Sequence, residues 1–412
     1  MLRIGFCSTW GSPCGIATYT AALSKALLEA KKEIQIVILA PRVDGSCGFP
    51  LIDLPYEFTW RPQMPAGYAT IFLDVARKHQ LQVIHFQHED GLFPHDYPFI
   101  QTLAELKKAG VKTLVTFHTL RPYGGVLRTG FFDAVKSYAD VVIAHTAAGE
   151  ASLLLAQGTA KVLRIPHGTL YPAPAGDKEK GYDSLQLPKR LRQGQILALV
   201  FGFANSGKNI LNTVHAFIEA HNRRLIKNTV LAISGLYSAE TYMQHEVRAA
   251  IALSGLSDII HQNENYTADC QVQDIFSVAD FAVLNTQSNT LSASGQVHLC
   301  AAYGVPLAAA NRPIYYDAIR AGAIPFAVEQ QTPSNPSLEA INAIASLAMC
   351  PSLRESVKRC MQKYAEQTAW SKLADGYCSL YGDLTKQSTG TDLNGKCSGE
   401  VVQGRSTDPR QS

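Results

Sequence analysis

The sequence predicts an α/β protein made of two Rossmann-like, doubly wound halves that face each other across a cleft. The first observation behind this fold class is that short apolar, β-rich runs alternate with amphipathic helical stretches from the first residue, which is typical of parallel sheets covered by helices. The second is that this alternation occurs in two series with an irregular stretch between them. A chain of 412 residues, 46% of them hydrophobic, can bury a core in each half.

The first series predicts an N-terminal domain over residues 1–172. After its first strand, the apolar positions Ile16, Tyr19, Leu23, Leu27 and Ala30 follow the spacing of one helix face. Helix-length segments also separate the later apolar runs. Strands are expected near residues 2–7, 34–39, 83–86, 111–116, 140–144 and 161–165.

The connection between the halves is expected at residues 173–194, because this stretch is rich in Pro, Gly and charged residues and has no periodicity. From residue 386 onward the chain holds no aromatic residue and few large apolar ones, too few to offset the entropy of ordering. Residues 386–412 are therefore expected to be a disordered tail. The second domain is expected over residues 195–365, with strands near 196–201, 229–233, 259–261, 281–284 and 305–309.

Composition argues against several functions. A formal net charge of +3 gives no strong signal for a nucleic-acid partner. The nine cysteines are scattered without a CxxC pair, which indicates neither a disulfide framework nor a zinc cluster. Without a signal-peptide pattern or an apolar run of about 18 residues, a cytoplasmic location is expected. Aromatic residues and arginines mix at 41–69 and 120–131, so peripheral contact with the inner membrane stays open.

Three strand-to-helix turns could bind an anion. The first, residues 8–20, has Gly15 where a helix begins, so a phosphate could approach the free amides and the positive end of the helix dipole. The alternative is that Gly15 only shapes a turn. The pattern GxGxxG is absent, so this turn does not predict a dinucleotide site.

The second turn, GFANSGKN at residues 202–209, nearly matches the phosphate loop of nucleotide triphosphatases. That motif needs Ser or Thr after its lysine to hold magnesium, whereas this chain has Asn209. Asp280 also precedes its strand instead of following it, so a triphosphatase is the weaker hypothesis. Lys208 could neutralise a diphosphate leaving group without metal, or it could be an ordinary surface lysine.

The third turn lies within residues 287–306, where Ser292, Ser294 and Gly295 precede a short apolar helix. Hydroxyl groups and bare amides would converge there on an anion. Ordinary N-capping by either serine is the alternative. Ligands of open α/β sheets bind beyond the carboxyl ends of the strands, so three such turns predict one shared cleft.

On the rim of the first half, two apolar strands end in polar groups, and these are expected to line the cleft on its acceptor side. The residues are His85, Gln87, His88, Glu89 and His118, and among them His85 best fits a structural role because it is nearest the strand core. Zinc is the sharper alternative for the two histidines at 85 and 88. Their spacing is not i, i+4 and no third ligand is evident, so no metal is expected.

These motifs, in this order, resemble the GT-B glycosyltransferases, in particular the retaining family 4 group, over roughly residues 1–385. The resemblance implies that Gly15 and Lys208 contact the donor diphosphate, that His118 lies beside the transferred sugar, and that the turn at Ser294 and Gly295 binds phosphate. It also implies that residues 366–385 return to the first domain. The motifs are CGIATYT, HFQHE, VTFHT, IPHGT, FGFANSGKN, VADFAVL, AAYGVP and W-x-x-x-A-x-x-Y-x-x-L-Y from Trp370 to Tyr381.

The chain also departs from that family. Leu291 and Leu299 stand where members commonly carry Glu, seven residues, Glu, and Phe203 or Gly202 replaces a basic residue. An atypical branch is therefore implied, whose donor specificity must come from other groups, around Ser292 to Gly295.

The function expected from these observations is transfer of a sugar from a nucleotide-diphosphate sugar to an acceptor, a step of glycan biosynthesis. The resemblance implies retention of configuration, no protein nucleophile, no metal and no cofactor besides the sugar nucleotide. The acceptor and the oligomeric state stay open. Two alternatives remain: a nucleotide-sugar epimerase or phosphorylase of the same fold, and a non-catalytic GT-B binding module.

Overall fold

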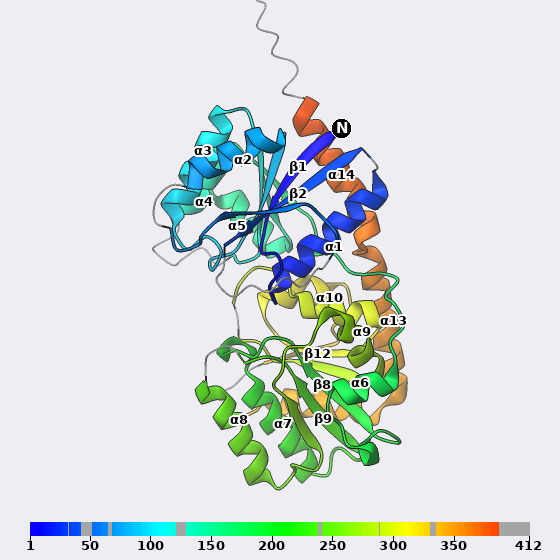
Figure 1. The fold of residues 1–412 in the computed structure, drawn as a ribbon. Helices are drawn as coiled ribbons and strands as arrows, with labels where there is room; N and C mark the ends of the chain where they lie inside the picture. Colours follow the sequence, from blue (N-terminus) through cyan, green and yellow to red (C-terminus); the bar gives the residue numbers. More distant parts are fainter. Residues whose placement is uncertain are drawn as a thin grey trace, which may run out of the picture.

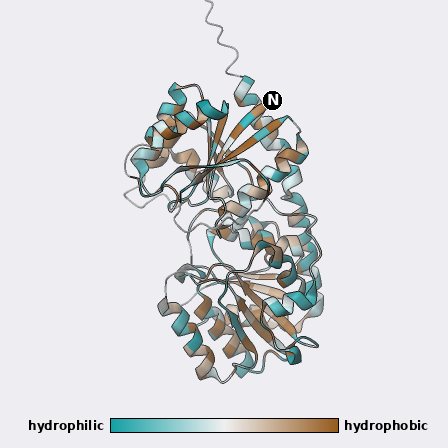
Figure 2. Ribbon diagram, viewed as in Figure 1, coloured by the Kyte–Doolittle hydropathy of each residue, from teal (hydrophilic) through white to brown (hydrophobic). Residues whose placement is uncertain are grey.

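The computed structural model describes residues 1–31, 33–42, 52–64, 68–120, 129–237, 241–287, 289–329 and 335–386. The tail beyond residue 386 lies outside the described residues. So do parts of 41–69 and 120–131, the stretches for which peripheral membrane contact was left open. The chain forms two halves, each with a parallel sheet covered by helices (Figure 1). Hydrophobic residues concentrate in the strands, and hydrophilic residues cover the outer helix surfaces (Figure 2).

In the described part of the chain, the first sheet has seven parallel strands in the order β3-β2-β1-β4-β5-β6-β7. The six strands expected from the sequence are confirmed within two residues. The edge strand β3 was not expected, because it leaves residues such as Tyr56 exposed and does not read as a buried apolar run. The strands are β1 (Leu2–Cys7), β2 (Ile34–Pro41), β3 (Tyr56–Trp60), β4 (Val83–His88), β5 (Lys112–Phe117), β6 (Val141–Ala144) and β7 (Lys161–Arg164).

Two cores sandwich this first sheet. One core packs the sheet against α1, and the other packs its opposite face against α2, α3 and α4. The helices are α1 (Gly15–Ala30), α2 (Tyr68–His79), α3 (Asp96–Lys108), α4 (Thr129–Tyr138) and α5 (Ala147–Leu155).

The second sheet has six parallel strands among the described residues, in the order β10-β9-β8-β11-β12-β13. The five expected strands are confirmed, with boundary shifts of up to two residues. The missed strand β13 is only three residues long at the sheet edge, too short for a periodic pattern. The strands are β8 (Ile196–Phe201), β9 (Thr229–Ser234), β10 (Ile260–Asn263), β11 (Phe281–Leu284), β12 (Leu307–Ala310) and β13 (Phe326–Val328).

Helices also cover both faces of the second sheet. The helices α7, α8 and α12 pack on one face, whereas α9, α10 and α13 pack on the other. They are α7 (Ile210–Asn222), α8 (Thr241–Ser254), α9 (Asp269–Val278), α10 (Gly295–Tyr303), α11 (Tyr316–Arg320), α12 (Leu338–Met349) and α13 (Pro351–Gln367), with short 3₁₀ turns η1 (Lys189–Leu191), η2 (Ser206–Lys208) and η3 (Pro313–Tyr315).

The last described helix, α14 (Trp370–Lys386), returns to the first half and lies along α1 (Figure 1). Its buried face includes Tyr377 and Tyr381 and joins the core between α1 and the first sheet. The backbone of Thr169 pairs with the turn before α14, accepting from the amide of Trp370 at 3.0 Å. This pairing anchors the returning helix where the chain leaves the first half.

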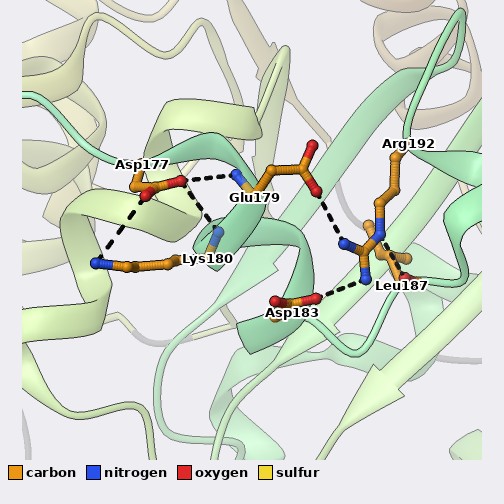
Figure 3. Close-up of polar contacts among 6 residues, drawn as sticks. All are labelled: Asp177, Glu179, Lys180, Asp183, Leu187 and Arg192. Atoms are coloured by element: carbon orange, nitrogen blue, oxygen red, sulfur yellow. Dashed lines mark hydrogen bonds and ion pairs between the residues drawn. The ribbon is translucent and has the colours of Figure 1, made fainter.

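The stretch between the halves contains α6 (Lys178–Ser184), which packs against α9 of the second half. The approach is so close that a Cβ at Gly181 would lie 2.2 Å from the carbonyl oxygen of Asp274. Arg192 then ties this stretch together: its guanidinium donates to Asp183 at 2.7 Å, to Glu179 at 3.1 Å and to the Leu187 carbonyl at 3.1 Å (Figure 3). A composition that predicts an irregular connection thus folds in part as a helix.

Replacing Arg192 by alanine is expected to lower the thermal midpoint by a few degrees, because one side chain with little exposure loses three hydrogen-bond acceptors at once. The matched control is Arg190→Ala, since Arg190 forms an ion pair with the exposed Asp258 at 2.8 Å and such exposed pairs contribute little. Differential scanning calorimetry measures both variants. Equal midpoints for the two would contradict the prediction.

Candidate functional site

The carboxyl ends of the two sheets face each other, and the loops that follow the strands meet there. After β5, the amide of Leu120 donates to the hydroxyl of Ser292 at 3.1 Å, and its carbonyl accepts from the amide of Leu291 at 2.7 Å. Both partners belong to the loop after β11. Helices α1 and α10 begin at the same boundary (Figure 1).

The sequence correctly located two helix starts at this boundary. Helix α1 begins at Gly15, where a Cβ would meet no atom within 4 Å, so the space beside this glycine is open. Helix α10 begins at Gly295, whose Cβ would lie 3.7 Å from Nε2 of His167. Ser294 precedes it, but its side chain makes no capping hydrogen bond and instead forms a hydrogen bond with the side chain of Tyr315. The interpretation of Ser294 as an ordinary side-chain cap is therefore wrong.

Lys208 lines a small pocket at the carboxyl ends of β8 and β11. Its ammonium donates to Oε1 of Gln296 at 2.5 Å, and burial lowers its pKa to about 8. No Asp or Glu is among the described residues that line this pocket. The interpretation as an ordinary surface lysine is therefore wrong: Lys208 is a half-buried cation with no carboxylate among the described residues of its pocket.

A row of four histidine rings connects the first half to α10. The ring centroid of His118, after β5, lies 5.4 Å from that of His145, after β6. The ring centroid of His145 in turn lies 5.6 Å from that of His167. His167 stacks on His298 of α10 at 4.5 Å. Tyr19 of α1 contacts the first three of these rings, with centroids 4.8 to 5.3 Å apart.

Burial holds these histidines neutral. It lowers the pKa of His145 to about 4 and that of His167 to about 3, and the pKa values of His118 and His298 also lie well below 6.5. His118 Nε2 lies 2.8 Å from Oε1 of Gln87. With the amide in this orientation, Nε2 carries the proton and donates, so Nδ1 is an acceptor. A neutral ring of this kind can accept a hydrogen bond from a hydroxyl group, but it has no positive charge that would attract a phosphate.

Three of these histidines were not among the expected site residues. His145 follows an apolar strand in the same way as His118, since the segments VIAHT and VTFHT have the same pattern. This pattern could have indicated His145 as a site residue. His167 lies in the motif IPHGT, to which no role was given. His298 could not be found from sequence, because it lies inside a helix and reads as a core position.

The rim residues of β4 have different fates, because alternate strand residues point to opposite faces of a sheet. His85 is buried and bonded to Tyr381 and to Thr116, each at 2.7 Å, which fits a structural role. Gln87 is fully buried and contacts His118, so the expectation that Gln87 itself lines the cleft is wrong. His88 is also fully buried, on the other face, stacked on Phe93 at 5.6 Å. The expectation that His88 lines the cleft is therefore wrong.

Two further expected residues are used within the protein itself. Glu89 follows β4 and accepts from the amide of Gly91 at 2.6 Å, so it shapes its own turn. Ser292 is 2% exposed and bonds to Leu120 across the boundary. Leu291 packs against the first-half core, and its carbonyl accepts from the hydroxyl of Thr146. The loop after β11 thus joins the halves.

Among the described residues, no group of three or more His, Cys, Asp or Glu side chains could hold a metal ion. The helices described here include none with the length and apolar character needed to span a bilayer.

Stability is expected to fall as the pH drops from about 6.5 toward 4, because His145 has a pKa of about 4 when folded and about 6.5 when unfolded. The unfolded chain therefore binds the proton first, and this residue alone contributes a slope of up to about 1.4 kcal/mol per pH unit. Urea midpoints at pH 7.5, 6 and 5 measure the slope. It should become shallower in His145→Asn and stay unchanged in the control His245→Asn, whose side chain is exposed; equal slopes in the two variants would contradict the prediction.

Comparison with known families supports the resemblance drawn from the motifs. Residues 13–170 match the family model described as Glycosyltransferase Family 4. No curated protein matches the sequence.

Solved structures match nearly the whole chain. HepE from Anabaena, in complex with UDP and glucose, has 12% identity and a TM-score of 0.71, covering 93% of this chain and 100% of that one. A glycosyltransferase from Rickettsia africae has 13% identity and a TM-score of 0.72, covering 93% and 99%. Sucrose-phosphate synthase from Thermosynechococcus elongatus has 16% identity and a TM-score of 0.69, covering 94% and 100%. The chain therefore has the GT-B fold, which confirms the predicted fold class.

Proposed function

We propose that this protein is a glycosyltransferase that moves a sugar from a nucleoside-diphosphate sugar to an acceptor, with retention of configuration and without a metal. The observation that carries the proposal is Lys208, a half-buried cation in a carboxylate-free pocket at the carboxyl edge of the second sheet. Such a pocket attracts an anion. The family match of the first half and the UDP and glucose bound by HepE support a sugar nucleotide as that anion.

The proposed reaction needs charge stabilisation more than proton transfer by the protein. The bond between the anomeric carbon and the diphosphate oxygen breaks, and the acceptor hydroxyl oxygen bonds to the same face of that carbon. The hydroxyl proton passes to the departing phosphate oxygen. Lys208 and the first amides of α10 stabilise the negative charge that develops on the diphosphate. The start of α1 at Gly15 is a second place that the phosphates can approach, because the space beside this glycine is open.

The neutral histidine at position 118 is assigned to the transferred sugar. With Nε2 committed to Gln87, its other nitrogen can accept from a sugar hydroxyl. This contact orients the donor. In a reaction without a protein nucleophile, binding energy lowers the barrier by holding the reactants in the right orientation. A cytoplasmic location stays a prediction from the sequence, and the acceptor and a peripheral membrane contact stay open.

The test is to incubate the protein with a panel of nucleotide sugars and record which nucleoside diphosphate is released, with and without candidate acceptors. We expect release from one donor, unaffected by EDTA, and a product that keeps the donor's anomeric configuration by NMR. Isomerised sugar nucleotide without acceptor would instead identify an epimerase. A need for inorganic phosphate would identify a phosphorylase.

A binding module is distinguished by the melting temperature. A donor at 100 times its Kd stabilises the protein by about 2.7 kcal/mol. No diphosphate release and no shift in melting temperature across the whole panel would overturn the proposed function.

A further inference from the structure

Gln296 occupies the first turn of α10 and connects three elements of the second half. Its Oε1 accepts from Nζ of Lys208 at 2.5 Å, and its Nε2 donates to the carbonyl oxygen of Phe201 at the end of β8. Both ends of the side-chain amide are therefore occupied. The strand, the lysine turn and the start of α10 are held at one point.

The backbone at Gly202 lies close to the Gln296 amide. Gly202 has a φ of 103°, a conformation that favours glycine. A Cβ at that position would lie 2.4 Å from Nε2 of Gln296. The glycine leaves room for the Gln296 amide, and the two hydrogen bonds of that amide give the side chain a defined position.

The chemistry of an amide suits this position better than that of a carboxylate. An amide oxygen orients the ammonium of Lys208 but carries no net charge, so the positive charge stays available to an anionic ligand. A glutamate of the same length would pair with the lysine, raise its pKa and repel a diphosphate. No carboxylate lines the described pocket, which agrees with this reasoning.

We infer that Gln296 is the positioning residue that aims the Lys208 ammonium at the diphosphate of the donor while leaving its charge uncompensated. This inference rests on the proposed function, and it adds a residue to which neither the motifs nor the comparisons give a role. Gln296 acts through Lys208 and not on the sugar.

The test compares Gln296→Glu, which keeps the shape and adds a negative charge, with Gln296→Met, which keeps much of the shape and removes the acceptor. In the wild type, donor turnover should decline above about pH 8 as Lys208 loses its proton. Gln296→Glu should move this decline upward by a pH unit or more and lower kcat/KM on the order of 10-fold or more. Gln296→Met should move it downward, because the charged form loses a hydrogen bond.

Two controls separate this role from a merely structural one. In a Lys208→Ala background, Gln296→Glu should no longer change the pH profile. NMR titration of labelled Lys208 in each variant reads the same coupling without any donor, so it stays informative if the proposed reaction is not observed. A Lys208 titration that is the same in wild type, Gln296→Glu and Gln296→Met would overturn the inference. If one variant does not fold by circular dichroism, the other has the opposite predicted direction and carries the test.

Discussion

Lys208→Ala is expected to lower kcat for donor turnover on the order of 100-fold or more, because it removes a charge contact that strengthens as the diphosphate departs. The pocket has no other cation among its described lining residues that could take over this role. Steady-state release of nucleoside diphosphate measures the effect. KM should change less than kcat, since the contact matters most in the transition state.

The matched control is Lys227→Ala, because Lys227 is exposed in the turn before β9, at the amino edge of the same sheet. It should keep the wild-type kcat. A folded Lys208→Ala variant with unchanged kcat would remove the role assigned to Lys208, whichever donor is used.

Trp370→Ala is expected to lower the free energy of unfolding by about 3–5 kcal/mol, the range for truncating a large buried aromatic side chain. Trp370 is 7% exposed, and its ring contacts Tyr19 at 4.9 Å. The backbone of Gly168 also lies against it, since a Cβ there would meet the indole ring at 2.1 Å. The variant therefore leaves a cavity where the returning helix α14 meets the first half.

Urea denaturation followed by circular dichroism measures this loss. Tyr97→Ala is the control, because Tyr97 is 73% exposed and a surface truncation changes stability by about 0.5 kcal/mol or less. Equal losses in the two variants would show that the contact between α14 and the first half contributes nothing to stability.

The fold was largely predictable because its central strands are buried on both faces. A strand such as β8, Ile196–Phe201, reads as a continuous apolar run, and both of its boundaries were predicted correctly. The edge strands β3 and β13 were missed for the converse reason. They are half-exposed or very short, so they lack the pattern on which the prediction depends.

The sequence predicted site residues correctly only where a local turn or helix start positions them. Gly15 and Gly295 stand at helix starts, and the turn between β8 and α7 carries Lys208, all as the sequence indicated. His88 was misplaced because it stands directly after another polar residue, Gln87, at the end of a fully buried strand, and polarity alone does not show which of the two faces the cleft. Gln87 and His88 are both fully buried, and they point to opposite faces of the sheet.

By itself, the sequence determined the two-sheet architecture, the turns at the carboxyl ends of the strands and the lysine among them. These features depend on hydrophobic periodicity and turn chemistry over a few residues. Only the tertiary structure brought His118, His145, His167 and His298 into one row and placed Gln296 on Lys208. Those contacts join residues 22 to 131 positions apart, and the contact between His167 and His298 crosses between the two halves. Such pairings arise from packing, which leaves no local pattern in the sequence.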